Sequence, residues 1–373
     1  MNDFGKMIFA STNESADLLY ATGFMAPDPY VFFEVNNSKY IVVTALEYGR
    51  AKKQAKSDVN VLDRDEILKA GDEPNAENLL LSITKKYSCK IWYIPKTFPF
   101  YYADFLMNKN VNIKCISDAF FPSRRCKTKL EVKYINEAMR MTESGMLRAE
   151  TIIREASVDS DGDLVYENEK LTSEFLIKAI NLDIVGNGGF ASETIASSGV
   201  QSSIPHETGY GVIKQGVPII IDIFPRVEAT GYHGDMTRTF VKRKAPATLK
   251  NAYEAIRKVR DYAKKNICAG IIPDILQNEI INMLDADGFK TGRNDDSYFG
   301  FFHSLGHGVG LEVHESPRCG SLVTEPLQTG DIVTVEPGVY YSEWGGVRLE
   351  DILYVTENGN ECITKYPDIL EIP

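Results

Sequence analysis

The pattern of apolar and polar residues predicts a small α/β domain over residues 1–122. Asn36-Asn37-Ser38 lies between two β-rich runs, and its small polar residues favour a tight turn that joins them as a hairpin. The predicted elements are the strands Tyr30–Val35, Lys39–Thr44 and Lys90–Ile94 and the helix Leu46–Lys56. We find no catalytic motif in this portion of the sequence.

A second domain is predicted from residue 123 to residue 373, and it begins with a long helix. Thr128-Lys129-Leu130-Glu131 has the form of a capping box, and apolar residues then recur at helical spacing. A basic patch of Arg124, Arg125 and Lys127 precedes the helix. We expect this patch to be a solvated linker, because charged side chains are seldom buried.

Beyond the long helix, the pattern alternates between helices and strands, which indicates an α/β (α+β) fold. Thr248–Ile267 has one apolar face, and Asp274–Asp287 is a further helix that ends at Gly288. The strands predicted in this part are Pro218–Ile223, Thr237–Val241, Ile332–Glu336 and Val347–Val355.

Length and composition set limits on the class of protein. A chain of 373 residues is too long for one ordinary core, which agrees with two domains. The net charge of −11 provides no basic face for nucleic acid or for an anionic membrane. No apolar run is long enough to span a membrane, and the N-terminus does not resemble a signal peptide. Six scattered cysteines without a CxxC pair favour free thiols and a cytoplasmic location.

The first candidate chemistry is an acid pair, Asp222 and Asp235. Asp222 follows a run of apolar residues, and Asp235 precedes the run Met236–Val241. A hairpin centred near Glu228-Ala229 would place the two carboxylates across from each other. Facing like charges destabilise a sheet unless a positive charge lies between them. The alternative interpretation is a pair of exposed loop acids.

A second acid pair repeats this arrangement. Glu336 ends one predicted strand, Glu350 lies within another, and the midpoint between them is Glu343, in a turn rich in small residues. An acid inside an apolar strand is costly to bury without a partner. A single case could be a salt bridge to Arg348, but two such pairs favour a site that binds cations.

Three of the five histidines lie between the two acid pairs: His303, His307 and His314. His303 and His307 have the spacing of a zinc-binding helix. However, the glycines at 306, 308 and 310 disfavour a helix there, because each costs about 1 kcal/mol relative to alanine. Glycine on both sides of His307 suits a backbone that passes close to a ligand such as a metal ion.

Four carboxylates and one imidazole form a hard ligand set, which suits two divalent ions such as manganese, cobalt or iron. We expect manganese, with zinc as an alternative. Two such ions about 3.5–4 Å apart can share a hydroxide and bind the oxyanion of a hydrolytic intermediate. Because the four negative charges would otherwise repel one another, metal binding should be coupled to the folding of the site.

The sequence resembles the pita-bread metallopeptidases, a family that includes aminopeptidase P, prolidase and methionine aminopeptidase. The matching segments are Gly231–Thr239 (GYHGDMTRT), His303–Pro317, Val335–Gly338 (VEPG) and Gly346–Asp351 (GVRLED). The resemblance covers residues 125–365. It implies a creatinase/prolidase-like N-terminal domain, followed by a pita-bread domain whose curved, mainly antiparallel sheet is covered by helices.

The resemblance also implies which residues bind metal. Asp222 would chelate one metal ion, and Asp235 and Glu350 would bridge both ions. His307 and Glu336 would hold the second ion. Glu336 would also move the proton of the nucleophile, a hydroxide that bridges the two metals.

Four further residues would act on the substrate. By the same resemblance, His314 would contact the scissile carbonyl and the oxyanion, and His206 would line the cleft beside the scissile amide. His303 and Arg348 would bind the substrate. Arg348 occurs in both proline-directed branches of the family, so it does not separate them.

One feature departs from the family pattern. Relatives usually have DxG at the first ligand and about eleven positions to the second, whereas Asp222-Ile223-Phe224 is followed by an interval of thirteen. An insertion of two residues keeps the parity of a hairpin, so we expect both ligands to be retained.

The resemblance predicts a metal-dependent exopeptidase that cleaves Xaa-Pro bonds, either at the N-terminus of peptides or in Xaa-Pro dipeptides, and that forms a homodimer. The separate N-terminal domain favours aminopeptidase P or prolidase over methionine aminopeptidase. Three alternatives stay open: an inactive scaffold with the same fold, an aminopeptidase of this fold without proline specificity, and an unrelated doubly wound binding protein.

Overall fold

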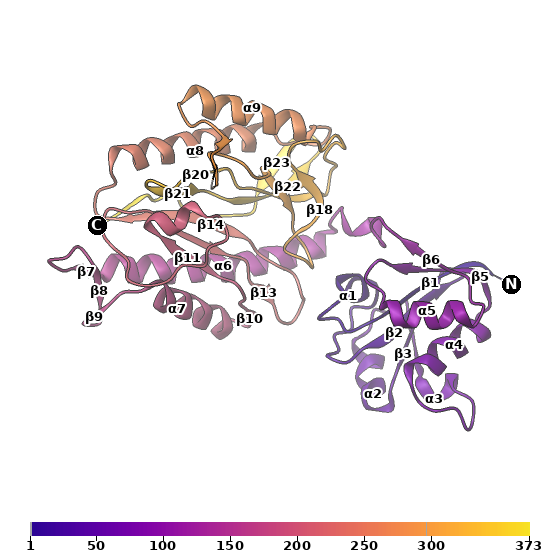
Figure 1. The fold of residues 1–373 in the computed structure, drawn as a ribbon. Helices are drawn as coiled ribbons and strands as arrows, with labels where there is room; N and C mark the ends of the chain where they lie inside the picture. The colour runs from indigo at the N-terminus through magenta and orange to yellow at the C-terminus, as the bar shows by residue number, and fades with distance from the viewer. Residues whose placement is uncertain (1, 296) are drawn as a thin grey trace. The chain divides into compact units, whose positions relative to one another are not determined.

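The computed structural model describes residues 2–295 and 297–373, and the chain divides into two compact units, Met1–Arg124 and Arg125–Pro373 (Figure 1). The sequence pattern predicts this division after residue 122. Each unit has its own hydrophobic core. Among the described residues, no helix combines the length and the apolar character that a membrane span needs.

Unit 1 is a six-stranded mixed sheet with the strand order β4-β3-β2-β1-β5-β6, and apolar clusters flank the sheet. The predicted hairpin is present, because Val35 pairs with Ser38 and both asparagines of the turn have positive φ angles. The strands are β1 Asn2–Ala10, β2 Tyr30–Val35, β3 Ser38–Val43, β4 Val59–Asp63, β5 Cys89–Pro95 and β6 Ile113–Ile116. The helices are α1 Ala16–Thr22, α2 Ala45–Gln54, α3 Arg64–Ile67, α4 Ala76–Lys86 and α5 Phe100–Asn108, and η1 Pro122–Arg124 is a 3-10 turn at the end of the unit.

Unit 2 is built from two sheets that carry the candidate ligands, with long helices on either side (Figure 1). Both sheets are antiparallel apart from one parallel strand pair at the edge of the first sheet. The first sheet has the order β11-β12-β14-β24 and the second has the order β18-β17-β19-β22-β23. Their strands are β11 Ile195–Ser198, β12 Ile219–Ile223, β14 Met236–Lys242, β17 Gly306–Gly308, β18 Glu315–Cys319, β19 Ile332–Val335, β22 Asp351–Thr356, β23 Gly359–Cys362 and β24 Glu371–Ile372.

Four helices cover these sheets: α6 Lys129–Glu155, α7 Ser173–Gly186, α8 Ala247–Asn266 and α9 Pro273–Ala286. The predicted capping box is present, since Thr128 and Glu131 exchange side chain to backbone hydrogen bonds at the start of α6. The main core lies between α8, α9 and the second sheet. The smaller elements are β7 Ser157–Val158, β8 Leu164–Tyr166, β9 Glu169–Lys170, β10 Gly189–Phe190, η2 Gly199–Ser203, β13 Arg226–Val227, β15 Gly292–Arg293, β16 Tyr298–Phe299, β20 Gly338–Tyr341 and β21 Gly345–Arg348.

The prediction of one strand over Val347–Val355 is wrong. The segment forms β21, which pairs with β20, and then β22, which pairs with β19. The ladder breaks between them because Pro337 has no N–H to donate, and because the N–H of Glu350 donates to Thr237 O in the first sheet. The break therefore connects the two sheets at the position of a candidate ligand.

Candidate metal centre

The hairpin β12–β14 carries Asp222 and Asp235, but they are not directly opposite each other as the sequence analysis expected. Asp222 pairs with Thr237, and Ile223 pairs with Met236. The turn is therefore centred one position later than predicted. Residues that pair across antiparallel strands share a face, and Asp235 lies two positions from Thr237. The two aspartates are thus diagonal neighbours on one face, which keeps them close.

The second acid pair faces as predicted. Val335 pairs with Asp351 on one side of the break in the ladder, and Gly338 pairs with Arg348 on the other side. This continuous register puts Glu336 opposite Glu350. The N–H of Glu336 donates to Leu305 O, so the strand that ends with Glu336 is fixed beside the segment that leads to His307.

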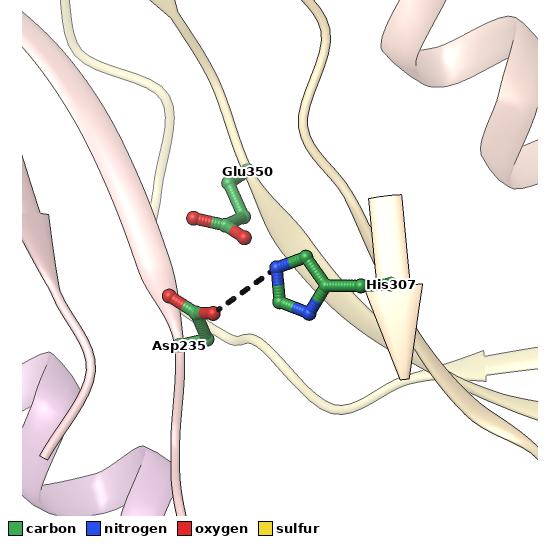
Figure 2. A group of neighbouring side chains, drawn as sticks. All are labelled: Asp235, His307 and Glu350. Atoms are coloured by element: carbon green, nitrogen blue, oxygen red, sulfur yellow. Dashed lines mark ion pairs between the residues drawn. The ribbon is translucent and has the colours of Figure 1, made fainter. Parts of the chain in front are cut away.

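His307 lies in the short strand β17 and not in a helix, as its flanking glycines predict. Gly306 has no room for a side chain, since a Cβ there would be 2.1 Å from Thr334 O. The His307 ring points toward Asp235 and Glu350 (Figure 2). Ligand atoms of these three buried residues all lie within 4.8 Å of one another. His307 Nε2 is 3.7 Å from Asp235 Oδ2 and 3.3 Å from Glu336 Oε1.

The orientation of the His307 ring suits a metal ligand. Its Nδ1 is 3.2 Å from Gly308 O, a carbonyl that only accepts hydrogen bonds, so Nδ1 carries the proton in this contact. In the neutral ring, the lone pair of Nε2 then faces the carboxylates of Asp235 and Glu336. This arrangement is repulsive unless a proton or a metal ion lies between the atoms.

Burial and mutual repulsion perturb the carboxylates of the site. Burial, together with the neighbouring acids, raises the pKa of Asp235 and of Glu350 well above the usual values. Burial also acts to raise the pKa of Glu336, but the hydrogen bond and charge of His307 outweigh it and lower the pKa. The strongly raised pKa values of two buried acids show that the neighbouring cations, Arg348 among them, do not offset the negative charge of the site.

Asp222 also fits a metal ligand. One of its oxygens, Oδ2, accepts a hydrogen bond of 2.7 Å from Arg348 Nη2. The other, Oδ1, is buried and has no hydrogen-bond partner among the described residues. An unpaired buried carboxylate oxygen is costly. The donor set of four carboxylates and one imidazole, with an orphaned oxygen and a repulsive interior, fits two divalent cations.

A chain of hydrogen bonds joins Asp222 to His303. Arg348 Nη1 donates to the Tyr340 hydroxyl at 2.8 Å, and this hydroxyl lies 3.0 Å from His303 Nε2. Because His303 Nδ1 donates to Ser304 O, Nε2 is the acceptor of the Tyr340 proton. Burial lowers the pKa of His303, so the ring is neutral in this chain. A cavity of about 530 Å³ lies beside His303, with Phe302, Tyr298 and Arg293 in its wall.

His314 and His206 both lie near the candidate ligands. The rings of His307 and His314 contact each other edge to face, with centroids 4.2 Å apart. His314 is exposed, but partial burial of its ring, with the charges of His307 and Arg318, lowers its pKa to about 4. His206 is exposed, and its charge contributes to the lowered pKa values of His303 and His314. Arg348 Nη1 is 3.3 Å from Pro205 O, next to His206.

Three residues that hold the site together were not predicted from the sequence. Thr237 Oγ1 donates to Glu350 Oε2 at 2.8 Å and lies 3.2 Å from Arg348 Nε. Thr334 Oγ1 accepts from the N–H of His307, and Tyr340 connects His303 with Arg348. Threonine and tyrosine are common in strands, so only their alternation with the candidate ligands could have marked them.

Comparison with known proteins identifies the family. The model of metallopeptidase family M24 matches residues 133–357, which include all the candidate ligands. The chain belongs to this family. The M24 assignment makes the protein a peptidase, and it confirms the expected pita-bread fold and the resemblance described above.

Relatives of this M24 peptidase cover most of its length. An Xaa-Pro dipeptidase of Pyrococcus furiosus is 30% identical over 87% of this chain and 84% of the relative. That of Pyrococcus horikoshii is 29% identical over 88% and 84%, respectively. The prolidase structure from P. furiosus superimposes with a TM-score of 0.80 at 25% identity, and covers 97% of this chain and 96% of that one. An X-Pro aminopeptidase from Thermotoga maritima shares the fold, with a TM-score of 0.82 at 22% identity over 100% and 98% of the chains.

Proposed function

We propose that this M24 peptidase binds two divalent metal ions and hydrolyses Xaa-Pro dipeptides. The observation that carries the proposal is the convergence of Asp235, His307 and Glu350 within 4.8 Å, beside an orphaned oxygen of Asp222. The proposed ligands are Asp222, Asp235, His307, Glu336 and Glu350. The identity and coverage of the Xaa-Pro dipeptidase relatives support the substrate class.

Metal ions bound at this site would supply a water molecule of lowered pKa and would polarise the scissile carbonyl. Glu336 is the residue we propose as proton acceptor. Its side chain is 18% exposed, against 5% for Asp235 and 6% for His307, so substrate and water reach it most easily. Beside bound cations the carboxylate of Glu336 would be ionised, and it would therefore be able to accept a proton at neutral pH.

We propose that His314 donates a hydrogen bond to the substrate oxygen. With a pKa of about 4, the ring is neutral at pH 7 and presents one N–H. The proline nitrogen of an Xaa-Pro bond must be protonated before it can leave. We propose that His206 lines the cleft beside this nitrogen. His303 and Arg348 are proposed substrate contacts, since their hydrogen-bond chain borders the cavity beside the site.

Arg318 supports a dipeptide as the substrate. It pairs with His307 across β17 and β18, so the two side chains start from the same face of the sheet. The charge of Arg318 contributes to the lowered pKa of His314. The C-terminal carboxylate of a dipeptide lies one residue from the scissile bond, and an arginine at this position is suited to bind it.

The test compares the hydrolysis of Ala-Pro, Ala-Pro-Leu and Ala-Ala by the purified protein with added manganese. We expect Ala-Pro to be cleaved with the highest kcat/KM and chelator-treated protein to be inactive. Faster cleavage of the tripeptide would assign an aminopeptidase. Cleavage of Ala-Ala as fast as Ala-Pro would show that the protein is not specific for proline. The absence of hydrolysis of any of the three peptides would refute the proposal.

Manganese as the metal, a homodimer and a cytoplasmic location stay predictions. The hard donor set supports manganese over a thiolate-preferring ion. All six cysteines are free thiols, which supports a reducing compartment. Elemental analysis of protein purified without added metal and sedimentation of the native protein test the first two.

A further inference from the structure

The basic patch that precedes α6 is not the solvated linker that the sequence analysis expected. The side chains of Arg125 and Lys127 are only 12% and 1% exposed. Each cation is paired with a carboxylate that lies in, or directly before, a strand of the second sheet of unit 2. Arg125 binds Asp331 through Nε and Nη2 at 2.9 and 3.0 Å, and Lys127 Nζ is 2.5 Å from Glu315 Oε1. These partners lie 206 and 188 positions away in sequence, which explains why local charge patterning misled the prediction.

Lys127 is fixed at both its backbone and its side chain. Its N–H donates to Gly330 O at 2.7 Å, next to the start of β19. Its Nζ donates to Arg125 O at 3.1 Å as well as to Glu315. The ammonium group therefore has a defined position, and this position determines where the Glu315 carboxylate lies.

Glu315 is equally confined. Its side chain is 8% exposed, and a Cβ added to Gly310 would lie 2.4 Å from Oε1, so the carboxylate fills the space above that glycine. Glu315 also pairs with Gly308 at the start of β18, where the register with β17 shifts. The ion pair thus holds the residue directly after His314 against the strand that carries His307.

The ring of His314 depends on this attachment. Its edge-to-face contact with His307 fixes one side, but no hydrogen-bond partner for the His314 ring is found among the residues that the structure describes. Because His314 is exposed, the place of its ring depends on this contact with His307 and on the backbone, which Glu315 anchors one residue later.

We propose that the buried Lys127–Glu315 ion pair positions His314 for catalysis, which makes Lys127 and Glu315 positioning residues. The inference rests on the proposed function, in which His314 contacts the substrate. Arg125 provides a matched control, because it is a cation of the same segment and has a similarly buried ion pair. Within the described part of the chain its side chain bonds to Asp331, Glu325 and the carbonyl of Pro326, and not to the residues beside His314.

The kinetic test compares Lys127→Met with Arg125→Met in the full-length protein with saturating manganese, using Ala-Pro. We expect kcat to fall at least 10-fold in Lys127→Met and less than 2-fold in Arg125→Met, although both variants have lowered Tm values. In a His314→Ala background, Lys127→Met should change kcat less than 2-fold, because the residue it positions is absent. Equal losses in the two single variants, or the same loss with and without His314, would overturn the proposal.

A second measurement is independent of catalysis. Hydrogen exchange of the amides at 311–316 should become at least several-fold faster in Lys127→Met and stay unchanged in Arg125→Met. The double variant Lys127→Met/Glu315→Gln has no lone buried charge, so it tests the same amides if Lys127→Met does not fold; it should also exchange faster than the wild type. Unchanged exchange at 311–316 would refute the positioning role. If the wild type hydrolyses no peptide, the proposed function fails while this measurement still decides the inference.

Discussion

Replacing Thr237 with valine tests whether the site is built to hold cations. Thr237 is fully buried, and its hydroxyl donates to Glu350 Oε2 at 2.8 Å. Valine keeps the shape of the side chain but removes this hydrogen bond and the one that the hydroxyl accepts from Arg348 Nε. Glu350 thus loses the group that orients its carboxylate. A hydrogen bond to a charged group contributes about 1.5–3 kcal/mol, which corresponds to a change of at least about 10-fold in an equilibrium constant. We therefore expect Thr237→Val to bind manganese about 10- to 100-fold more weakly.

The assay is calorimetric titration of chelator-treated protein with manganese. Thr239→Val is the control, because Thr239 lies two residues further along β14 and is equally buried. Its hydroxyl bonds, among the residues the structure describes, to the backbone of Arg348. It should lose comparable stability and keep its manganese affinity within about 3-fold. Equal affinities of Thr237→Val and the wild type would show that Glu350 does not bind metal, and equal losses in both variants would show a general effect of packing.

Three further predictions concern the proposed roles. Glu336→Ala should lower kcat at least about 100-fold at saturating manganese while circular dichroism shows the fold intact, because it removes the proton acceptor; near-normal turnover would refute that role. His314→Ala should slow hydrolysis strongly and leave metal content unchanged, and a parallel loss of metal would make His314 a ligand. In metal-free protein, Asp235 and Glu350 have raised pKa values, so the stability from their protonated forms is present at low pH. In the unfolded chain these carboxyl groups have pKa values of about 4. The stability is lost as the pH rises above that value and through the higher pKa values of the folded protein. The Tm of the metal-free protein should thus fall over this range, and a rise in Tm would contradict the assigned electrostatics. Asp235→Asn should flatten the dependence, and saturating manganese should remove it.

The elements that the sequence predicted well are those with local signals. The capping box at Thr128 and the asparagine turn of unit 1 depend on neighbouring residues, and both are present. The facing of Glu336 and Glu350 was also predictable, since the small residues around Glu343 fix the centre of that hairpin.

The predictions that failed depend on distant contacts. The hairpin that carries Asp222 is displaced by one position, because several residues between Val227 and Tyr232 suit a turn equally well. The split of Val347–Val355 arises from a backbone hydrogen bond to Thr237, more than a hundred positions away. Likewise, the burial of Lys127 depends on Glu315, a partner that no local pattern reveals.

The central claim is that five side chains from two sheets bind a pair of divalent cations. Anomalous diffraction from crystals grown with manganese measures this directly. We predict two anomalous peaks in contact with Asp222, Asp235, His307, Glu336 and Glu350. The absence of any peak at these residues in crystals with excess manganese, or peaks bound elsewhere while these side chains point apart, would contradict it.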